Sequence, residues 1–271
     1  MSNTKSIDKY LNGQALVGDN YDPQEISQWF EDEREAYAEL GAGERTTYRY
    51  DYHALNIFHG YRHLTTFKQF NHVCGFGSAY GDELLPIKDK IKKVTIIDSS
   101  KKFADGFMGG INASFICARP DGVIEAADGE FDLITCIGVL HHIPNVSFVL
   151  RELTRCLKPN GIMLLREPTT SMGDWRKHRR GLTSRERGIP AHILRRIIDE
   201  CDLKTMHHSQ CVFSPLSTLT ASFGISVGSH LPLVILDLLF SRLSGWNYRY
   251  HRRRLIEKFA PASEFYVLTK Q

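Results

Sequence analysis

The sequence predicts an α/β protein with a doubly wound, mostly parallel sheet. From residue 72 onward, short apolar runs of strand length alternate with segments of helix length, which is typical of buried parallel strands joined by helical crossovers. The chain has 271 residues, of which 42% are hydrophobic and 24% charged, so it can bury one substantial core. No repeat or low-complexity linker divides it into independent domains.

Composition excludes several classes of protein. A net charge of +3 gives no general attraction to nucleic acid, and six scattered cysteines without a Cys-x-x-Cys pair indicate reduced thiols. The first residues lack the basic and apolar regions of a signal peptide. The most apolar window, residues 231–243, is too short to span a bilayer and contains Asp237 and Arg242. We therefore expect a cytoplasmic protein without a membrane span.

Amphipathic helices are predicted ahead of the sheet. Asp22 followed by Pro23 forms a helix N-cap with proline at the first helical position, and apolar residues at helical spacing follow from Ile26. A second amphipathic stretch lies over residues 52–67. Together these segments predict an N-terminal helical cap over residues 1–70.

The predicted strands and crossover helices then follow in alternation. The runs that predict strands are 72–75, 93–98, 113–117, 131–137, 161–168, 206–213 and 264–270. The segments that predict crossover helices are 81–90, 100–108, 146–157 and 190–201. In a doubly wound sheet, ligands bind at the carboxyl ends of strands near the switch in strand order. The residues that follow the strands are therefore the candidates for binding.

Two such strand ends carry suitable residues. Gly75, Gly77 and Gly81 allow a ligand to approach the backbone closely, although a turn that merely tightens the strand-to-helix corner is an alternative. Asp98 follows the second strand, where its carboxylate can accept hydrogen bonds from both ribose hydroxyls of a nucleoside. Capping of the next helix is the alternative role for Asp98 or Ser99.

The stretch from residue 131 to 168 resembles the fourth strand, following helix and fifth strand of class I S-adenosylmethionine (SAM)-dependent methyltransferases. The features in family order are Asp132, the turn LHHIP, an apolar helix with Arg155, the turn Lys158–Gly161, and a strand ending in Glu167 and Pro168. The resemblance covers about residues 70–213 and the final strand. It implies a seven-stranded Rossmann-like sheet with an antiparallel last strand, and SAM as cofactor.

The glycine turn then matches the family's first motif, which holds the methionine end of SAM. The matched positions are Gly75, Gly77, Ala79 and Gly81, with Ser78 between them. Gly75 stands where the family has an acidic residue, so a usual anchor for the cofactor's amino-acid end is missing, and nearby Asp82 and Glu83 do not obviously substitute for it. Ala79 replaces the middle glycine, which is a mild change if the backbone there is not at positive φ.

The resemblance also implies the remaining cofactor contacts. Asp98 matches the acid that binds the ribose. Asp121 is the candidate for the acid that meets the adenine amine, with a solvated turn as the alternative. Further cofactor contacts are expected from Ser99, Ile137 and Gly138 at the strand ends.

Two histidines and a glutamate are the candidates for catalysis. Methyl transfer is an in-line displacement in a site that excludes water, and an oxygen or nitrogen acceptor must also lose a proton. His141 and His142 follow the fourth strand, where the loop borders cofactor and acceptor, and we expect His141, or else His142, to act as base or acceptor contact. Glu167 is a further candidate, with a buried, hydrogen-bonded acid as the alternative. The paired histidines alone do not make a metal site, so no metal is expected.

Two segments are expected to meet the acceptor. The loop after the fifth strand carries an arginine cluster around Trp175, in which Arg176 and Arg180 could grip phosphate or carboxylate, with a solvated loop as the alternative. Residues 214–262, longer than the family's usual hairpin between its last two strands, indicate a helical insertion. We expect this insertion to form a lid over the acceptor, with extra packing or a dimer contact as the alternative.

Together these features predict a cytoplasmic SAM-dependent methyltransferase that acts on oxygen of a small anionic or sugar-containing acceptor. The SAM-binding core is expected over residues 71–213 and 263–271, and a homodimer is compatible with the sequence. Two alternatives stay open. Arginine-rich loops suggest an RNA methyltransferase, although no separate RNA-binding module is visible. Gly75 and Ala79 suggest a non-catalytic scaffold that retains the fold.

Overall fold

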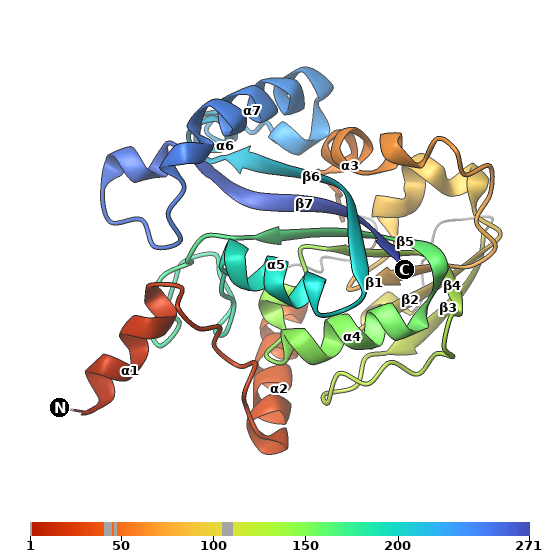
Figure 1. Cartoon of the computed structure of the whole chain (residues 1–271), viewed down its shortest axis with the longest axis horizontal. Helices are drawn as coiled ribbons and strands as arrows, with labels where there is room; N and C mark the ends of the chain where they lie inside the picture. Colours follow the sequence, from red (N-terminus) through yellow and green to blue (C-terminus); the bar gives the residue numbers. More distant parts are fainter. Residues whose placement is uncertain (1, 41–44, 46–47, 105–110) are drawn as a thin grey trace.

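A seven-stranded sheet runs through the computed structural model, which describes residues 2–40, 45, 48–104 and 111–271 (Figure 1). The strands in spatial order are β3 (Asn112–Cys117), β2 (Lys93–Asp98), β1 (Val73–Phe76), β4 (Phe131–Ile137), β5 (Leu157–Pro168), β7 (Pro261–Lys270) and β6 (Leu203–Phe213). Strands β1 to β5 pair in parallel, whereas β7 is antiparallel to both β5 and β6. The predicted doubly wound sheet with an antiparallel last strand is confirmed.

The switch in strand order lies at β1. This strand pairs with β2 on one side and β4 on the other, so Gly75 lies between Ile96 and Thr135. The carboxyl ends of β1, β2 and β4 therefore open at one edge of the sheet, where ligands bind in this architecture. Strand β5 begins four residues before its predicted start because Leu157 already pairs with Phe131 ahead of an irregularity in the register.

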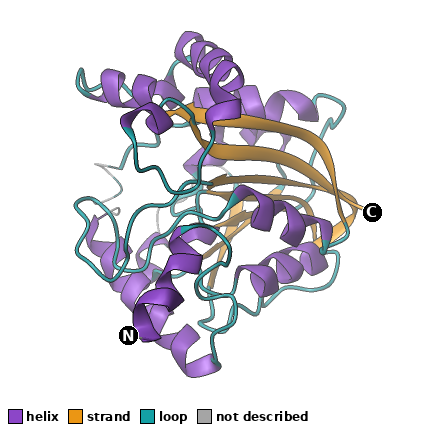
Figure 2. Cartoon of the chain, turned by 60° about the vertical axis from the view of Figure 1, so that its left-hand side comes forward, coloured by secondary structure: helices purple, strands orange, loops and turns teal. Residues whose placement is uncertain are grey.

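Helices cover both faces of the sheet (Figure 2). The amphipathic helices α4 (Val146–Cys156) and α5 (Ala191–Asp199) pack their apolar sides on one face. Two of the predicted crossover helices are not α-helices where the structure describes them. The segment η2 (Asp82–Lys90) is a 3-10 helix that contains Pro86, which lacks an N–H group for the α-helical pattern. The predicted helix 100–108 contains the 3-10 turn η3 (Lys101–Phe103), and its residues 105–108 lie outside the described part of the chain.

The N-terminal region is helical, as predicted. Its elements are α1 (Ser2–Leu11), α2 (Pro23–Leu40), α3 (His53–His59) and η1 (Tyr61–Leu64). The Asp22 carboxylate accepts hydrogen bonds from the N–H groups of Gln24 and Glu25, which confirms the predicted N-cap. The fully buried Trp29 donates from its indole to the His142 carbonyl at 2.7 Å. Helix α2 is thereby fixed against the loop that follows β4.

Residues 214–262 form helices before the last strand. The elements are α6 (Ser214–Ala221), η5 (Val227–Ser229), α7 (Leu231–Ser244), η6 (Gly245–Asn247) and η7 (Leu255–Lys258). The buried Asp237 carboxylate accepts hydrogen bonds from the N–H groups of Val212 and Phe213, which ties α7 to the end of β6. Among the described helices, none combines the length and apolar content required to cross a bilayer.

Candidate active site

A first cavity opens at the carboxyl ends of β1, β2 and β4. It is lined by residues from three strand ends, by α2 and by the loop after β4. The predicted cofactor residues that line it are Gly77, Asp98, Ser99 and Gly138. Its remaining walls are largely apolar, which suits a flat heterocycle.

The glycine turn has little space for side chains. A Cβ at Gly77, whose φ is +63°, would lie 2.4 Å from the Val139 side chain, and one at Gly75 would lie 2.6 Å from the Ser78 hydroxyl. Gly81 also has a positive φ and begins η2. Ala79 has a φ of 49°, so the condition under which this alanine is a mild change is not met. Gly75, Ala79 and Gly81 shape the turn without lining a cavity.

Asp98 is fixed by the turn that it faces. Its buried carboxylate accepts hydrogen bonds from the N–H of Ala79 at 3.0 Å and of Ser100 at 3.2 Å. Burial raises the pKa of Asp98, while hydrogen bonds from these backbone N–H groups act in the opposite direction. The carboxylate is therefore oriented at the wall of the first cavity, next to Ser99.

Asp121 does not meet the first cavity. Its half-exposed carboxylate forms an ion pair with Arg119 at 2.7 Å and accepts a hydrogen bond from the N–H of Val123. The geometry instead brings Asn145 to the cavity wall, a residue that sequence reasoning missed. The Asn145 amide donates to the Asp121 carbonyl at 2.9 Å, and its buried Oδ1 accepts no hydrogen bond from the described part of the chain. The contact with adenine is therefore reassigned from Asp121 to Asn145 as a candidate.

A second cavity shares a wall with the first. Gly77 and Gly138 line both cavities, and Ser78 and Ile137 line the second one. The second cavity is more polar and is bordered by the segment of residues 48–52, which precedes α3. Two cavities that meet at a pair of glycines can hold two ligands whose reacting ends touch.

Arg166 brings a positive charge to the wall of the second cavity. It comes from the end of β5, and its guanidinium lies over the Tyr52 ring at 4.2 Å. Among the residues that the structure describes, none forms a hydrogen bond with its buried Nη1. Sequence reasoning missed this residue because its neighbour Glu167 matched the family pattern. An unsatisfied guanidinium N–H at a cavity wall is suited to an anionic ligand group.

Glu83 supplies a buried carboxyl group beside Gly75. It lines the second cavity and accepts a hydrogen bond at 3.1 Å from Thr135, the β4 residue that pairs with Gly75. Burial raises the pKa of Glu83 to about 7, although hydrogen bonds from Ser78 and Thr135 oppose this shift. Asp82, in contrast, is bound by both guanidinium nitrogens of Arg45 at 2.8 Å. Of the two acids after the glycine turn, Glu83 is thus the one that faces a cavity.

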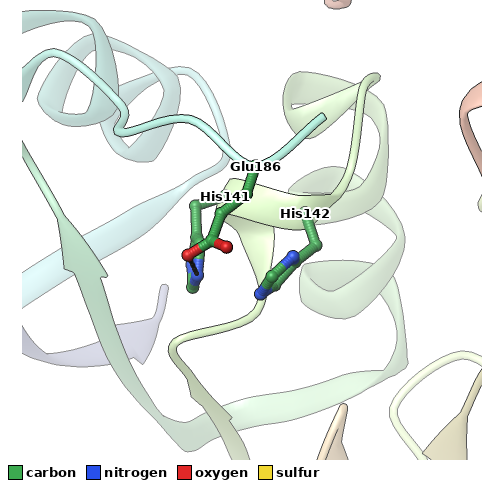
Figure 3. Close-up of side chains that lie close together, drawn as sticks. All are labelled: His141, His142 and Glu186. Atoms are coloured by element: carbon green, nitrogen blue, oxygen red, sulfur yellow. Dashed lines mark ion pairs between the residues drawn. The ribbon is translucent and has the colours of Figure 1, made fainter. Parts of the chain in front are cut away.

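The paired histidines lie at the boundary of the two cavities, where His141 lines the second and His142 the first. Figure 3 shows both rings, with the Glu186 carboxylate next to His141. His141 Nδ1 is 2.8 Å from a Glu167 oxygen, and its Nε2 is 3.5 Å from Glu186. Burial lowers the pKa of His141, but the hydrogen bonds to Glu167 and Glu186 outweigh it and raise the pKa to about 9. Burial and the charge of His141 lower the pKa of His142, whose Nδ1 is 2.7 Å from Glu33. A protonated ring therefore adjoins a neutral one.

Three of these residues could approach a metal ion. Ligand atoms of His141, His142 and Glu186 lie within 4.8 Å of one another. The ion pair of protonated His141 with Glu186 brings these two residues together. The guanidinium of Arg187 interacts with the charges of Glu167 and Glu33. Three ligand atoms without a fourth protein ligand among the described residues fall short of a structural site, so we propose no metal at this cluster.

Glu167 holds the loop after β4. Its carboxylate is fully buried and accepts hydrogen bonds from the N–H groups of Val139, Leu140 and His141. It lines neither cavity. With its oxygens engaged and out of reach of a ligand, Glu167 is better described as a residue that positions His141 than as a base.

The arginine-rich loop carries the three residues that were predicted to contact the acceptor, Trp175, Arg176 and Arg180. Arg176 forms an exposed ion pair with Asp174, Trp175 contacts the Tyr10 ring edge-on, and Arg180 is exposed. None of the three predicted acceptor contacts lines a cavity. Buried Arg187, from the same loop, donates to backbone carbonyls. The number of charges in the loop could not show that Arg187 binds buried carbonyl groups while Arg176 and Arg180 face solvent.

The comparisons agree with this geometry. A family profile described as a methyltransferase domain matches residues 48–208, which is more than half of the chain. The chain therefore belongs to this family, and its seven-stranded sheet with an antiparallel last strand is the fold of class I methyltransferases. The ubiquinone biosynthesis O-methyltransferase of Burkholderia vietnamiensis is 22% identical over 144 residues, which cover 52% of this chain. The match spans 61% of that relative's length.

Solved structures share the fold at low sequence identity. A SAM-dependent methyltransferase from Leishmania major has a TM-score of 0.55 at 10% identity, covering 98% of this chain and 91% of its own. One from Archaeoglobus fulgidus has a TM-score of 0.51 at 14% identity, covering 86% and 98%. The cyclase SpnF has a TM-score of 0.55 at 14% identity, covering 94% and 97%. The fold alone therefore does not define the substrate.

Proposed function

We propose that this methyltransferase methylates an oxygen atom of a small anionic or sugar-containing acceptor. The observation that carries the proposal is the pair of cavities that meet at Gly77 and Gly138, one suited to a nucleoside and the other containing an unsatisfied guanidinium. The relative from Burkholderia vietnamiensis is an O-methyltransferase by name, which favours oxygen as the methylated atom.

The first cavity would hold the adenosyl part of SAM. Asp98 and Ser99 would meet the ribose, and the unsatisfied Asn145 Oδ1 would accept a hydrogen bond from the adenine amine. The methionine end would extend past Gly77 toward Ser78 and the second cavity. Bound SAM would supply an electrophilic methyl group on a sulfonium.

Glu83 would replace the missing acid of the first motif. The family's acid lies at the position of Gly75, and a carboxyl group from η2 reaches Thr135 beside that same glycine. A carboxylate there would pair with the ammonium of the cofactor's amino-acid end. This placement supports cofactor binding despite the departure at Gly75.

The second cavity would hold the acceptor. Arg166 would bind its anionic group, and the rings of Tyr50 and Tyr52 would pack on its flat part. The insertion contributes Ser226 to this cavity, and hydroxyls of Ser226 and Ser229 both donate to the Asp51 carbonyl at 3.0 Å. These contacts support a lid made of the insertion and the segment before α3.

The two histidines would have different parts in the transfer. The acceptor oxygen forms a bond to the methyl carbon as the carbon–sulfur bond breaks, and the acceptor hydroxyl gives up its proton. Protonated His141 cannot take that proton at neutral pH, so it would stabilise the ionised acceptor oxygen. Neutral His142, or solvent, would receive the proton.

A panel of acceptors tests this proposal. Formation of S-adenosylhomocysteine would be measured with hydroxybenzoates, nucleotide-linked sugars, uncharged hydroxyl compounds and tRNA. We expect turnover with anionic small molecules. Arg166→Gln should raise the acceptor KM roughly tenfold or more, the effect of losing a hydrogen bond to a charged group, without a comparable change in SAM affinity. Exposed Arg176→Gln is the matched control.

Other outcomes assign the site differently. Turnover with tRNA alone would identify an RNA methyltransferase, and SAM binding without turnover on any acceptor would favour a scaffold. If Arg166→Gln weakens SAM binding and leaves the acceptor KM unchanged, Arg166 belongs to the cofactor site and the anionic acceptor loses its support.

A further inference from the structure

The insertion exposes an unusual amount of apolar surface. Most of the exposed large apolar side chains in the described chain lie between residues 219 and 259. Trp246 is 79% exposed and Leu255 78%, and Phe259 is half exposed. So many exposed apolar side chains within one segment of about forty residues indicate an interaction site.

Helix α7 is apolar on both of its sides, since Leu233, Leu236 and Phe240 also pack inward against a buried cluster. Its buried side carries Val234, Asp237 and Ser241, two of which are polar. Its outer side carries Leu231, Ile235, Leu239 and Leu243, spaced four residues apart and between 48% and 65% exposed. If the outer side of this helix met only water, polar residues would be expected at these four positions. Figure 1 shows α7 outermost, above β6 and β7.

Basic residues accompany this apolar surface. Residues 214–262 contain six arginine and lysine residues and two acids, a net charge of +4, whereas the whole chain carries +3. One of the two acids, Asp237, is buried. Arg253, Arg254 and Lys258 are exposed beside Leu255 and Phe259.

We propose that this surface, formed by the outer side of α7 with Trp246 and residues 253–259, docks on an anionic lipid bilayer. Leucine, tryptophan and phenylalanine side chains next to arginine and lysine are the combination that inserts at the headgroup boundary. Lipid phosphates complement the excess positive charge. A second copy of the chain would bring the same positive charges together, so charge disfavours a symmetric dimer through this surface.

Vesicle co-sedimentation of the full chain tests the proposal. We expect binding to phosphatidylcholine vesicles that contain about 30% phosphatidylglycerol, little binding to phosphatidylcholine alone, and weaker binding as salt is added. Two double variants, Leu239→Asp with Leu243→Asp and Arg253→Glu with Arg254→Glu, should each lower the partition coefficient about tenfold or more. Retained SAM affinity would show that the variants are folded, because these residues line neither cavity.

A matched control lies at the far end of β6. Met206 is 52% exposed and Lys204 is also exposed, so Met206→Asp with Lys204→Glu changes the same properties elsewhere and should leave vesicle binding unchanged. Equal binding of the wild type to neutral and anionic vesicles, or no binding, would overturn the proposal. The proposal would also be overturned if light scattering showed a dimeric wild type and a monomeric Leu239→Asp, Leu243→Asp variant. The surface would then bind a second copy of the chain.

Discussion

Asp98 ends β2 with its carboxylate held by two backbone N–H groups, so a ribose would find it already oriented. Asp98→Asn keeps the shape and removes the charge. We expect SAM binding to weaken by about 1.5–3 kcal/mol, the range for hydrogen bonds that involve a charged group. Calorimetry measures this loss, and Asp121→Asn, whose side chain lies outside the cavity, should bind like the wild type. Wild-type affinity in a folded Asp98→Asn variant would contradict the ribose assignment.

Glu83 gives SAM binding a dependence on pH. Burial raises its pKa to about 7, so the neutral form predominates below that pH and must lose its proton to pair with an ammonium. Affinity should therefore fall roughly tenfold between about pH 8 and pH 6 through this group. Glu83→Gln removes this step, and titration of SAM itself is common to both proteins. Parallel pH profiles for wild type and variant would exclude the proposed pairing.

Sequence reasoning found the residues whose position along a strand determines their role. Asp98 is one, since a polar residue directly after a buried strand must emerge at the ligand edge of the sheet. Glu83 was considered and set aside, and Arg166 and Asn145 were missed, because the surroundings of all three depend on which chain segments meet in space. Glu83 acts beside Gly75 only because β1 and β4 are neighbours, which places Thr135 next to that glycine.

At the scale of elements, the strands were predictable because buried parallel strands are nearly continuous apolar runs. The type of helix was harder to predict. The helical pattern of residues 81–90 did not show that η2 is a 3-10 helix, which contains Pro86. The arginine-rich loop was misinterpreted because composition does not reveal whether a guanidinium meets solvent or carbonyl oxygens. Arg187 is the clearest case, since it is buried and fastens the loop after β4.

Arg187→Met tests this fastening. Several buried carbonyls, among them those of Val17, Leu140 and Ile143, would lose a donor. We expect the free energy of unfolding to fall by about 3–4 kcal/mol, with weaker SAM binding because the same loop lines the first cavity. Urea denaturation measures the loss. Exposed Arg180→Met should stay within about 0.5 kcal/mol of wild type, and a similar value for Arg187→Met would show that the loop is held by other contacts.

At the scale of the whole molecule, the N-terminal helices are joined to the antiparallel edge of the sheet. His59 at the end of α3 is fully buried, with Nδ1 2.7 Å from the Ser209 hydroxyl of β6 and its ring stacked on Phe265 of β7. Burial, assisted by the charge of Arg62, lowers the pKa of His59 to about 3. The neutral ring thus belongs to the folded state. We propose that the cap and the insertion act with the sheet as parts of one acceptor site.

This neutral histidine predicts a loss of stability in mild acid. Because the folded-state pKa is lowered, the stabilisation is present above about pH 6.5 and is lost as pH falls toward 3. Between about pH 7 and pH 5 the free energy of unfolding should fall by about 2 kcal/mol through His59, since one pKa unit corresponds to about 1.4 kcal/mol. His59→Asn should lose stability at neutral pH yet show a correspondingly smaller fall on acidification, measured by urea denaturation at both pH values. Exposed His178→Asn should retain the wild-type difference. If His59→Asn shows the same fall in the free energy of unfolding as the wild type, another group causes the loss of stability in acid. The buried histidine would then not control the contact between the cap and the sheet.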